Sequence, residues 1–143
     1  MQCRPATVND SRLLAELNAQ LIADSGHRNP MGIDELEARM RGWLGGEYTA
    51  RVFEDEAGPL AYALYRVGGE GVYLRQFLVL PDQRRRGVGR QAIAELRDRH
   101  WPKGKRLTVD VLVTNTAAVE FWRAVGFTDY CLTLEIFPDR DLA

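Results

Sequence analysis

The sequence predicts an α/β fold: a mixed, mostly antiparallel central sheet with helices on both faces. Three strand-like stretches between residues 49 and 80 are joined only by short turns rich in glycine and acidic residues, so we expect them to be antiparallel neighbours. A helical stretch at 87–100 separates the strand at 72–80 from another at 107–114. A crossover through a helix makes two such strands parallel, with a right-handed connection.

The spacing of apolar residues places the remaining elements. The first helix follows Asn9, Asp10 and Ser11, each of which suits a helix N-cap. In chain order we expect an extended segment at 1–5, that helix up to residue 22, a helix at 34–44, strands at 49–54, 60–67 and 72–80, a helix at 87–100, a strand at 107–114, a helix at 116–125 and a last strand at 128–137.

Length and composition indicate one domain over residues 1–143, because 45% of the residues are hydrophobic and 27% are charged. The net charge is −1, so the arginines at 84–86 are a local feature and we expect no nucleic-acid partner. No apolar run approaches the length that spans a bilayer, and residues 1–5 lack the apolar region of a signal peptide. We therefore expect no membrane association and a cytoplasmic location. Cys3 and Cys131 have no metal-ligand spacing, so we expect no metal and no disulfide.

A basic, glycine-containing stretch lies between a predicted strand and a predicted helix. The strand ends at Pro81, arginines follow at 84–86, and the helix begins near Gly87. Free backbone N–H groups and the helix dipole favour anions at a helix N-terminus, and arginine side chains bind phosphate oxygens. Gly87 and Gly89 would let a ligand approach the backbone. The stretch therefore predicts a phosphate-binding loop, with a solvated basic turn as the alternative.

Three motifs resemble those of the GCN5-related N-acetyltransferases. They are Arg4-Pro5-Ala6-Thr7 with Asp10, then Val79-x-Pro81…Arg84-x-x-Gly87-x-Gly89, then Asn115-x-x-Ala118-x-x-Phe121-Trp122-x-x-x-Gly126-Phe127. The resemblance covers essentially the whole chain. It implies the fold of that family and acetyl-CoA as the acyl donor.

The resemblance also assigns donor-binding residues. The pantetheine arm would bond the backbone of Phe77, Leu78 and Val79, and Asn115 would bond it near the thioester. The groove would be lined by Ala118 and Phe121. The pyrophosphate would bind the loop and helix start formed by Arg84, Arg85, Arg86, Gly87, Val88, Gly89 and Arg90.

Acetyl transfer to an amine needs a base, because an amine with a lysine-like pKa of about 10.4 is mostly protonated at pH 7. Asp110 matches the position where family members carry a catalytic glutamate, and we expect it to be buried near the thioester and to act through water. The alternative is that Asp110 only orders a loop or meets Arg106. Trp122 stands where the family has its tyrosine acid; its indole N–H could still bond the sulfur, and Tyr73 or Tyr130 could replace the acid.

The acceptor side is less defined. In the family, the loop between the first two helices lines the acceptor pocket, and here it carries His27 and Arg28. Gln76 would point into the cleft if Phe77 faces the core, because successive side chains of a strand alternate. We expect the acceptor to be a small-molecule or peptide amine. We also expect a homodimer, since the strand at 128–137 would be an edge that needs cover.

Other interpretations remain. Gly87-x-Gly89-x-x-Ala92 fits a loose dinucleotide fingerprint, but residues 81–86 separate it from the strand, which disfavours that interpretation. A non-catalytic acyl-CoA-binding sensor or interaction module would bind the donor without turnover. A donor larger than acetyl-CoA is also compatible with the sequence. Direct transfer is favoured over an acyl-cysteine because neither cysteine lies in the donor-binding motifs.

Overall fold

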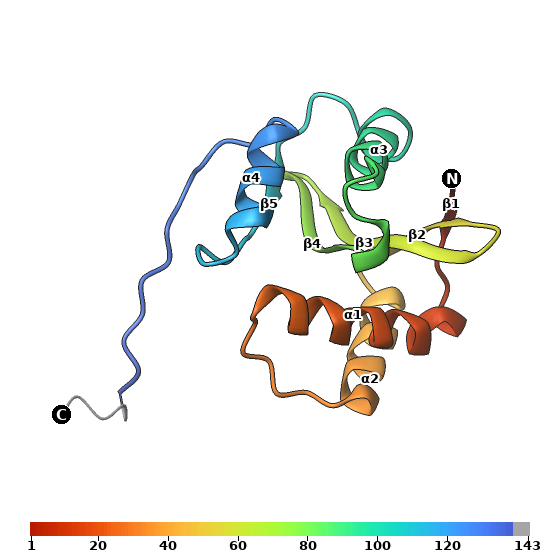
Figure 1. Ribbon diagram of the computed structural model, residues 1–143, viewed down its shortest axis with the longest axis horizontal. Helices are drawn as coiled ribbons and strands as arrows, with labels where there is room; N and C mark the ends of the chain where they lie inside the picture. The colour runs from red at the N-terminus through yellow and green to blue at the C-terminus, as the bar shows by residue number, and fades with distance from the viewer. Residues whose placement is uncertain (139–143) are drawn as a thin grey trace.

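The computed structural model describes residues 1–138. Its five strands pair in chain order: β1 (Gln2–Pro5), β2 (Tyr48–Asp55), β3 (Gly58–Gly68), β4 (Gly71–Val79) and β5 (Leu107–Val109). The first four are antiparallel neighbours, whereas β4 and β5 are parallel. Helices α1 (Ser11–Ser25) and α2 (Ile33–Leu44) cover one face, and α3 (Val88–Glu95) lies on the other (Figure 1). The predicted fold class is confirmed, including the parallel pair across α3.

Short turns of helix and a further α-helix complete the order. One-turn 3-10 helices lie at Val8–Asp10 and Pro81–Gln83, and a π-helical turn, Leu96–His100, extends α3. Helix α4 (Thr116–Ala124) follows β5, and its Trp122 belongs to the same apolar core as Val88 and Ile93 of α3. None of the helices in residues 1–138 is long and apolar enough to cross a membrane.

The sheet separates two apolar cores. The core under α1 and α2 is built from Leu14, Leu17, Met40, Tyr48, Ala50, Val52, Tyr62, Leu64 and Leu78. The core under α3 and α4 is built from Phe53, Ala61, Ala63, Tyr65, Leu74, Val88, Ala92, Ile93, Leu96, Trp101 and Trp122. Alternate strand residues supply the two sides, as expected for a sheet covered on both faces.

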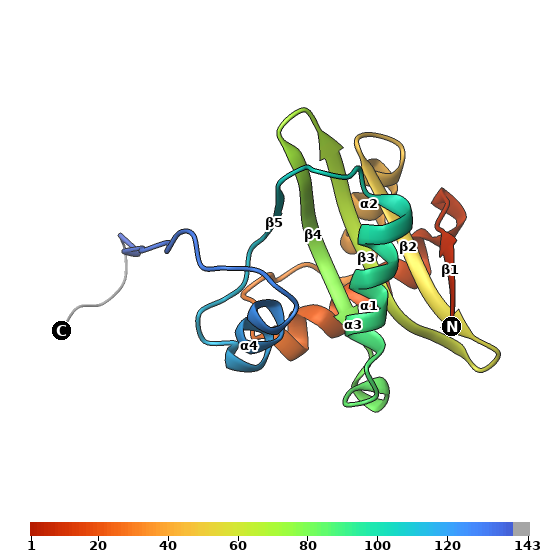
Figure 2. The same cartoon turned by 90° about the horizontal axis from the view of Figure 1, so that it is seen from above.

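A β-bulge in β4 and the early end of β5 create an opening in the sheet. Leu64 of β3 opposes Gln76, but the next residue opposes Leu74, so Arg75 is the extra residue. Strand β5 pairs with β4 only along Val72 to Leu74. After Val109 the chain moves away from β4 (Figure 2). The two parallel strands are thus joined at one end and apart at the other.

Two strand predictions differ from the structure. The strand predicted at 107–114 is bonded only over three residues, because β4 bulges where the pairing ends. The last strand predicted at 128–137 is absent: this segment runs away from the sheet without pairing (Figures 1 and 2). A strand needs a neighbour for its backbone groups, and the described part of one chain supplies none here.

Candidate active site

The opening between β4 and β5 carries free backbone on one side. Beyond Leu74, no described residue pairs with β4 on the side of β5. The edge that this leaves runs through Phe77 and Leu78 to Val79, where Arg84 Nε already donates to the Val79 carbonyl at 2.9 Å. Unpaired N–H and C=O groups at a strand edge bind an extended ligand that itself has amide groups.

The basic loop leads from this edge to the start of α3. Arg85 (φ +64°) and Gly87 (φ +77°) are both left-handed. Such a turn gathers backbone N–H groups into an anion-binding concavity at the helix N-terminus. Arg85 and Arg90 are exposed and make no ion pair within residues 1–138, whereas Arg86 donates to Gln83 at 3.0 Å. The loop therefore has the backbone conformation and, among the described residues, the unpaired positive charge that suit a phosphate.

Arg84 already has two partners within the protein. Its guanidinium pairs with Asp24 at the end of α1, with N–O of 2.8 Å, in addition to the bond to Val79. This pairing neutralises its charge and ties the loop to α1.

Gly89 is needed for packing rather than for ligand approach. A Cβ on Gly89 would lie 3.0 Å from Phe121 Cε1 of α4 and 3.3 Å from Val79 Cγ2. Phe121 stacks on Phe77 with ring centroids 6.0 Å apart and an interplanar angle of 11°. Gly89 thus lets α3 approach both β4 and α4.

Helix α4 forms the other wall. Asn115 caps it by accepting a hydrogen bond from Ala118 N at 3.2 Å, which leaves its amide N–H groups to donate elsewhere. Trp122 is only 7% exposed and packs against Phe121 and Phe127, with centroids 4.9 and 5.3 Å away. Its position is that of a core residue.

Tyr73 and Asp110 meet where β4 and β5 separate. Tyr73 Oη donates to Asp110 Oδ2 at 2.9 Å. Burial, with a smaller effect of this bond, raises the pKa of Tyr73 to about 12. Asp110 itself is exposed, in contrast to the expectation that it is buried. It does not pair with Arg106, which lies over the ring of Tyr130 at 4.9 Å.

The residues expected to bind the acceptor differ in burial, and they do not form one cluster with Asp110 among the contacts of the described residues. His27 and Arg28 are exposed on the loop between α1 and α2, and Arg28 donates to Glu135 at 2.7 Å. Gln76 is buried and accepts a hydrogen bond from Tyr62 Oη at 2.8 Å, so it supports the core. Tyr130 is 85% exposed. None of these contacts brings Tyr130 or Gln76 to Asp110.

The pairing of Tyr73 with Asp110 was not predicted. Tyr73 opposes Thr108 in the parallel register, so Asp110, two residues further on, lies on the same face of the sheet. The sequence gives the alternation of each strand but not this register. A row of arginine and aromatic side chains near Tyr73, described below, was also missed.

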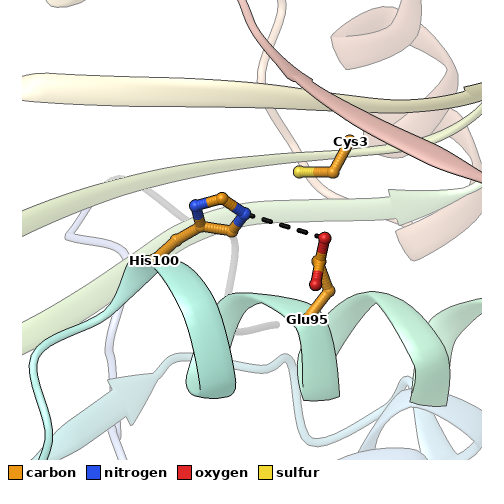
Figure 3. Close-up of side chains that lie close together, drawn as sticks. All are labelled: Cys3, Glu95 and His100. Carbon is orange, nitrogen blue, oxygen red and sulfur yellow. Dashed lines mark ion pairs between the residues drawn. The ribbon is translucent and has the colours of Figure 1, made fainter.

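A separate polar cluster lies at the far end of α3. Cys3 of β1, Glu95 and His100 face one another (Figure 3), with all three ligand-type atoms within 4.8 Å. The π-helical turn brings Glu95 and His100, five residues apart, to the same side. Burial raises the pKa of the Cys3 thiol, and Arg51 bonds to it. Since Arg51 already puts a positive charge there, the cluster does not require a cation.

Taken together, a free strand edge, a basic loop at a helix N-terminus and a carboxylate where the strands part are features that suit a protein of the class that binds an extended phosphate-containing ligand. The model of the Acetyltransferase (GNAT) family matches residues 16–127, so the chain belongs to this family. It is therefore a member of an acetyltransferase family.

Solved structures share the fold. The tetramutant of BH1408 protein from Bacillus halodurans is 23% identical and has a TM-score of 0.75, covering 95% of this chain and 99% of that chain. The aminoglycoside N-acetyltransferase AAC(6')-Iy in complex with CoA is 19% identical, with a TM-score of 0.76 and coverage of 97% and 95%. AAC(6')-IG from Acinetobacter haemolyticus is 18% identical, with a TM-score of 0.76 and coverage of 99% and 100%. A search of the curated proteins found no match to this chain.

Proposed function

We propose that residues 1–143 act as one domain that moves the acetyl group of acetyl-CoA directly to a primary amine of a small molecule or peptide. The observation that carries the proposal is the bond between Tyr73 and Asp110 at the point where β4 and β5 separate. It holds a carboxylate beside the opening in which an acyl donor would lie.

Acetyl-CoA is supported as the acyl donor because the chain offers groups that suit each part of it. The pyrophosphate matches the N-terminus of α3 with Arg85 and Arg90, and the pantetheine amides match the free edge of β4 from Phe77 to Val79. Asn115 keeps two N–H donors free beside this path.

The reaction then needs one proton acceptor. The amine nitrogen attacks the thioester carbonyl, the new C–N bond forms, and the C–S bond breaks to release the CoA thiolate. Asp110, through a water molecule, takes the proton that the amine loses. Tyr73 is a positioning residue: its hydroxyl fixes the carboxylate, but with a pKa of about 12 it is a poor proton donor to a thiolate. A thiol has a pKa of about 8.5, so solvent can protonate the leaving group.

Trp122 has a packing role in this mechanism. Its indole is buried among phenylalanine rings on the wall of the opening. Tyr130 is 85% exposed and contacts Arg106, so we give it no part in the proton transfer.

Binding and turnover test the proposal separately. Thermal unfolding is measured with and without saturating acetyl-CoA, with NAD as the control ligand. Ligand at about 100 times Kd adds about 2.7 kcal/mol, which is a shift of several degrees. A thiol-release assay with a panel of amines follows. A shift with acetyl-CoA and thiol release with some amines support the proposal. A shift without release on any amine would instead favour the acyl-CoA sensor.

A further inference from the structure

Arginine and aromatic side chains alternate in a row on the sheet face that carries α1 and α2. We call it the arginine row. Arg39 and Arg75 lie over Trp43 at 4.5 and 4.7 Å, and Arg66 lies over Tyr48 and Tyr73 at 5.5 and 5.7 Å. Arg75 also reaches Tyr48, with 5.8 Å to the ring and a 3.4 Å bond to its hydroxyl.

The row ends at the candidate active site. Its last aromatic residue, Tyr73, donates to Asp110, and Arg75 is the bulged residue at which β4 and β5 part. A group bound along the row would therefore lie beside the carboxylate that we assign as the base.

The positive charge of the row is incompletely balanced. Arg66 pairs with Glu47 at 3.6 Å, but Arg39 bonds the neutral Asn18 at 3.1 Å and Arg75 bonds a tyrosine. Neither Arg39 nor Arg75 has an ion pair with an acid within residues 1–138. Burial and the charge of Arg75 lower the pKa of Arg39. Arg39 Nε is buried and has no hydrogen-bond partner among the described residues.

Two guanidinium groups near one aromatic ring, without a counter-ion, disfavour each other and favour an anion. Arginine is suited to this task because its fork matches carboxylate and phosphate oxygens. A polycationic amine would be repelled by the same charges.

We infer that the acceptor carries a carboxylate or phosphate group, which Arg39 and Arg75 bind while its amine meets Asp110. This inference rests on the proposed acetyltransferase function. It names the substrate class of that site: an amine with an acidic group.

Matched amines test it. Kinetics are measured for amino acids against their amides, and for phosphoethanolamine against ethanolamine. We expect kcat/KM to be at least tenfold higher for the acidic member of at least one pair. Arg75→Gln should abolish that preference mainly through KM. Arg41→Gln is the control, because Arg41 is on the same helix as Arg39, is exposed and pairs with Glu37 at 3.5 Å. Preference for the neutral amines, or a preference unchanged in folded Arg75→Gln, would overturn the inference.

A second readout does not need turnover. With the enzyme saturated by CoA, so that the loop at 84–90 is filled, inorganic phosphate should raise the Tm of the wild type but not of Arg75→Gln. If phosphate raises the Tm but no amine is acetylated, the proposed function is refuted while the anion-binding site is supported. Absence of this stabilisation would refute the anion site.

Discussion

Gly71 controls how closely β5 approaches β4, and its replacement by alanine tests the geometry of the site. A Cβ at this position would lie 2.1 Å from the Arg106 carbonyl oxygen, and 3.0 Å from its carbon. The residue also has φ of +139°, which alanine adopts only with strain. Because the obstacle is backbone, β5 must move away from β4.

The cost follows from these contacts. Moving the strand breaks the hydrogen bond from Val72 N to Arg106 O, now 2.8 Å, worth about 1 kcal/mol. The strained backbone adds about 1–3 kcal/mol. We therefore expect Gly71→Ala to lower the free energy of unfolding by roughly 2–4 kcal/mol, or Tm by on the order of 5–15 °C for a chain of this size.

The same movement should separate Asp110 from Tyr73, because Tyr73 lies on β4 and Asp110 directly follows β5. Turnover should fall more than acetyl-CoA binding, since the loop at 84–90 is untouched. Gly69→Ala is the matched control: it lies in the same turn, and no atom lies within 4 Å of its added Cβ. Urea unfolding and thiol release are measured for both variants. If Gly71→Ala behaves like Gly69→Ala, the close approach of β5 does not hold the site together.

Three further outcomes are expected. Gly89→Ala should push the Phe121 ring, 3.0 Å from the added Cβ, and raise KM for acetyl-CoA several-fold; an unchanged KM would show that this wall does not touch the donor. Trp122→Phe should destabilise the core by about 1–3 kcal/mol but keep much of kcat, and a loss of three decades in kcat would instead make Trp122 catalytic. Burial lowers the pKa of His100 from 6.5, so the unfolded chain binds its proton more readily and stability should fall as pH drops below about 6.5. His100→Gln should flatten that slope in pH-dependent urea unfolding, and an unchanged slope would place its origin elsewhere.

Local sequence patterns predicted most of the fold. The helix predicted at 34–44 and the strand at 72–80 lie within a residue of α2 and β4. Alternation of apolar residues at 107–114 correctly indicated a strand start whose Leu107, Val109 and Val111 pack on the core, whereas Val113 is 66% exposed. It did not indicate where pairing stops, because that depends on the bulge at Arg75 in another strand.

Features that depend on two segments were beyond sequence reasoning. Residues 128–137 have the right alternation, but a strand forms only when a neighbour is present. Tyr73 meets Asp110 only through the parallel register of β4 and β5. Gly89 was expected to admit a ligand, whereas its neighbour is Phe121, which lies 32 positions away by sequence numbering and meets it only in three dimensions.

The base assignment is the central chemical claim, and Asp110→Asn tests it most directly. The amide keeps the shape and still contacts Tyr73, but it cannot accept the proton. At pH 7 we expect kcat to fall by about 10²–10⁴ with acetyl-CoA affinity unchanged, and the deficit to shrink toward pH 10 as free amine accumulates. Asp98→Asn, an exposed acid at the far end of α3, should keep full activity. If Asp110→Asn keeps more than half of the wild-type kcat at pH 7, Asp110 is not the base.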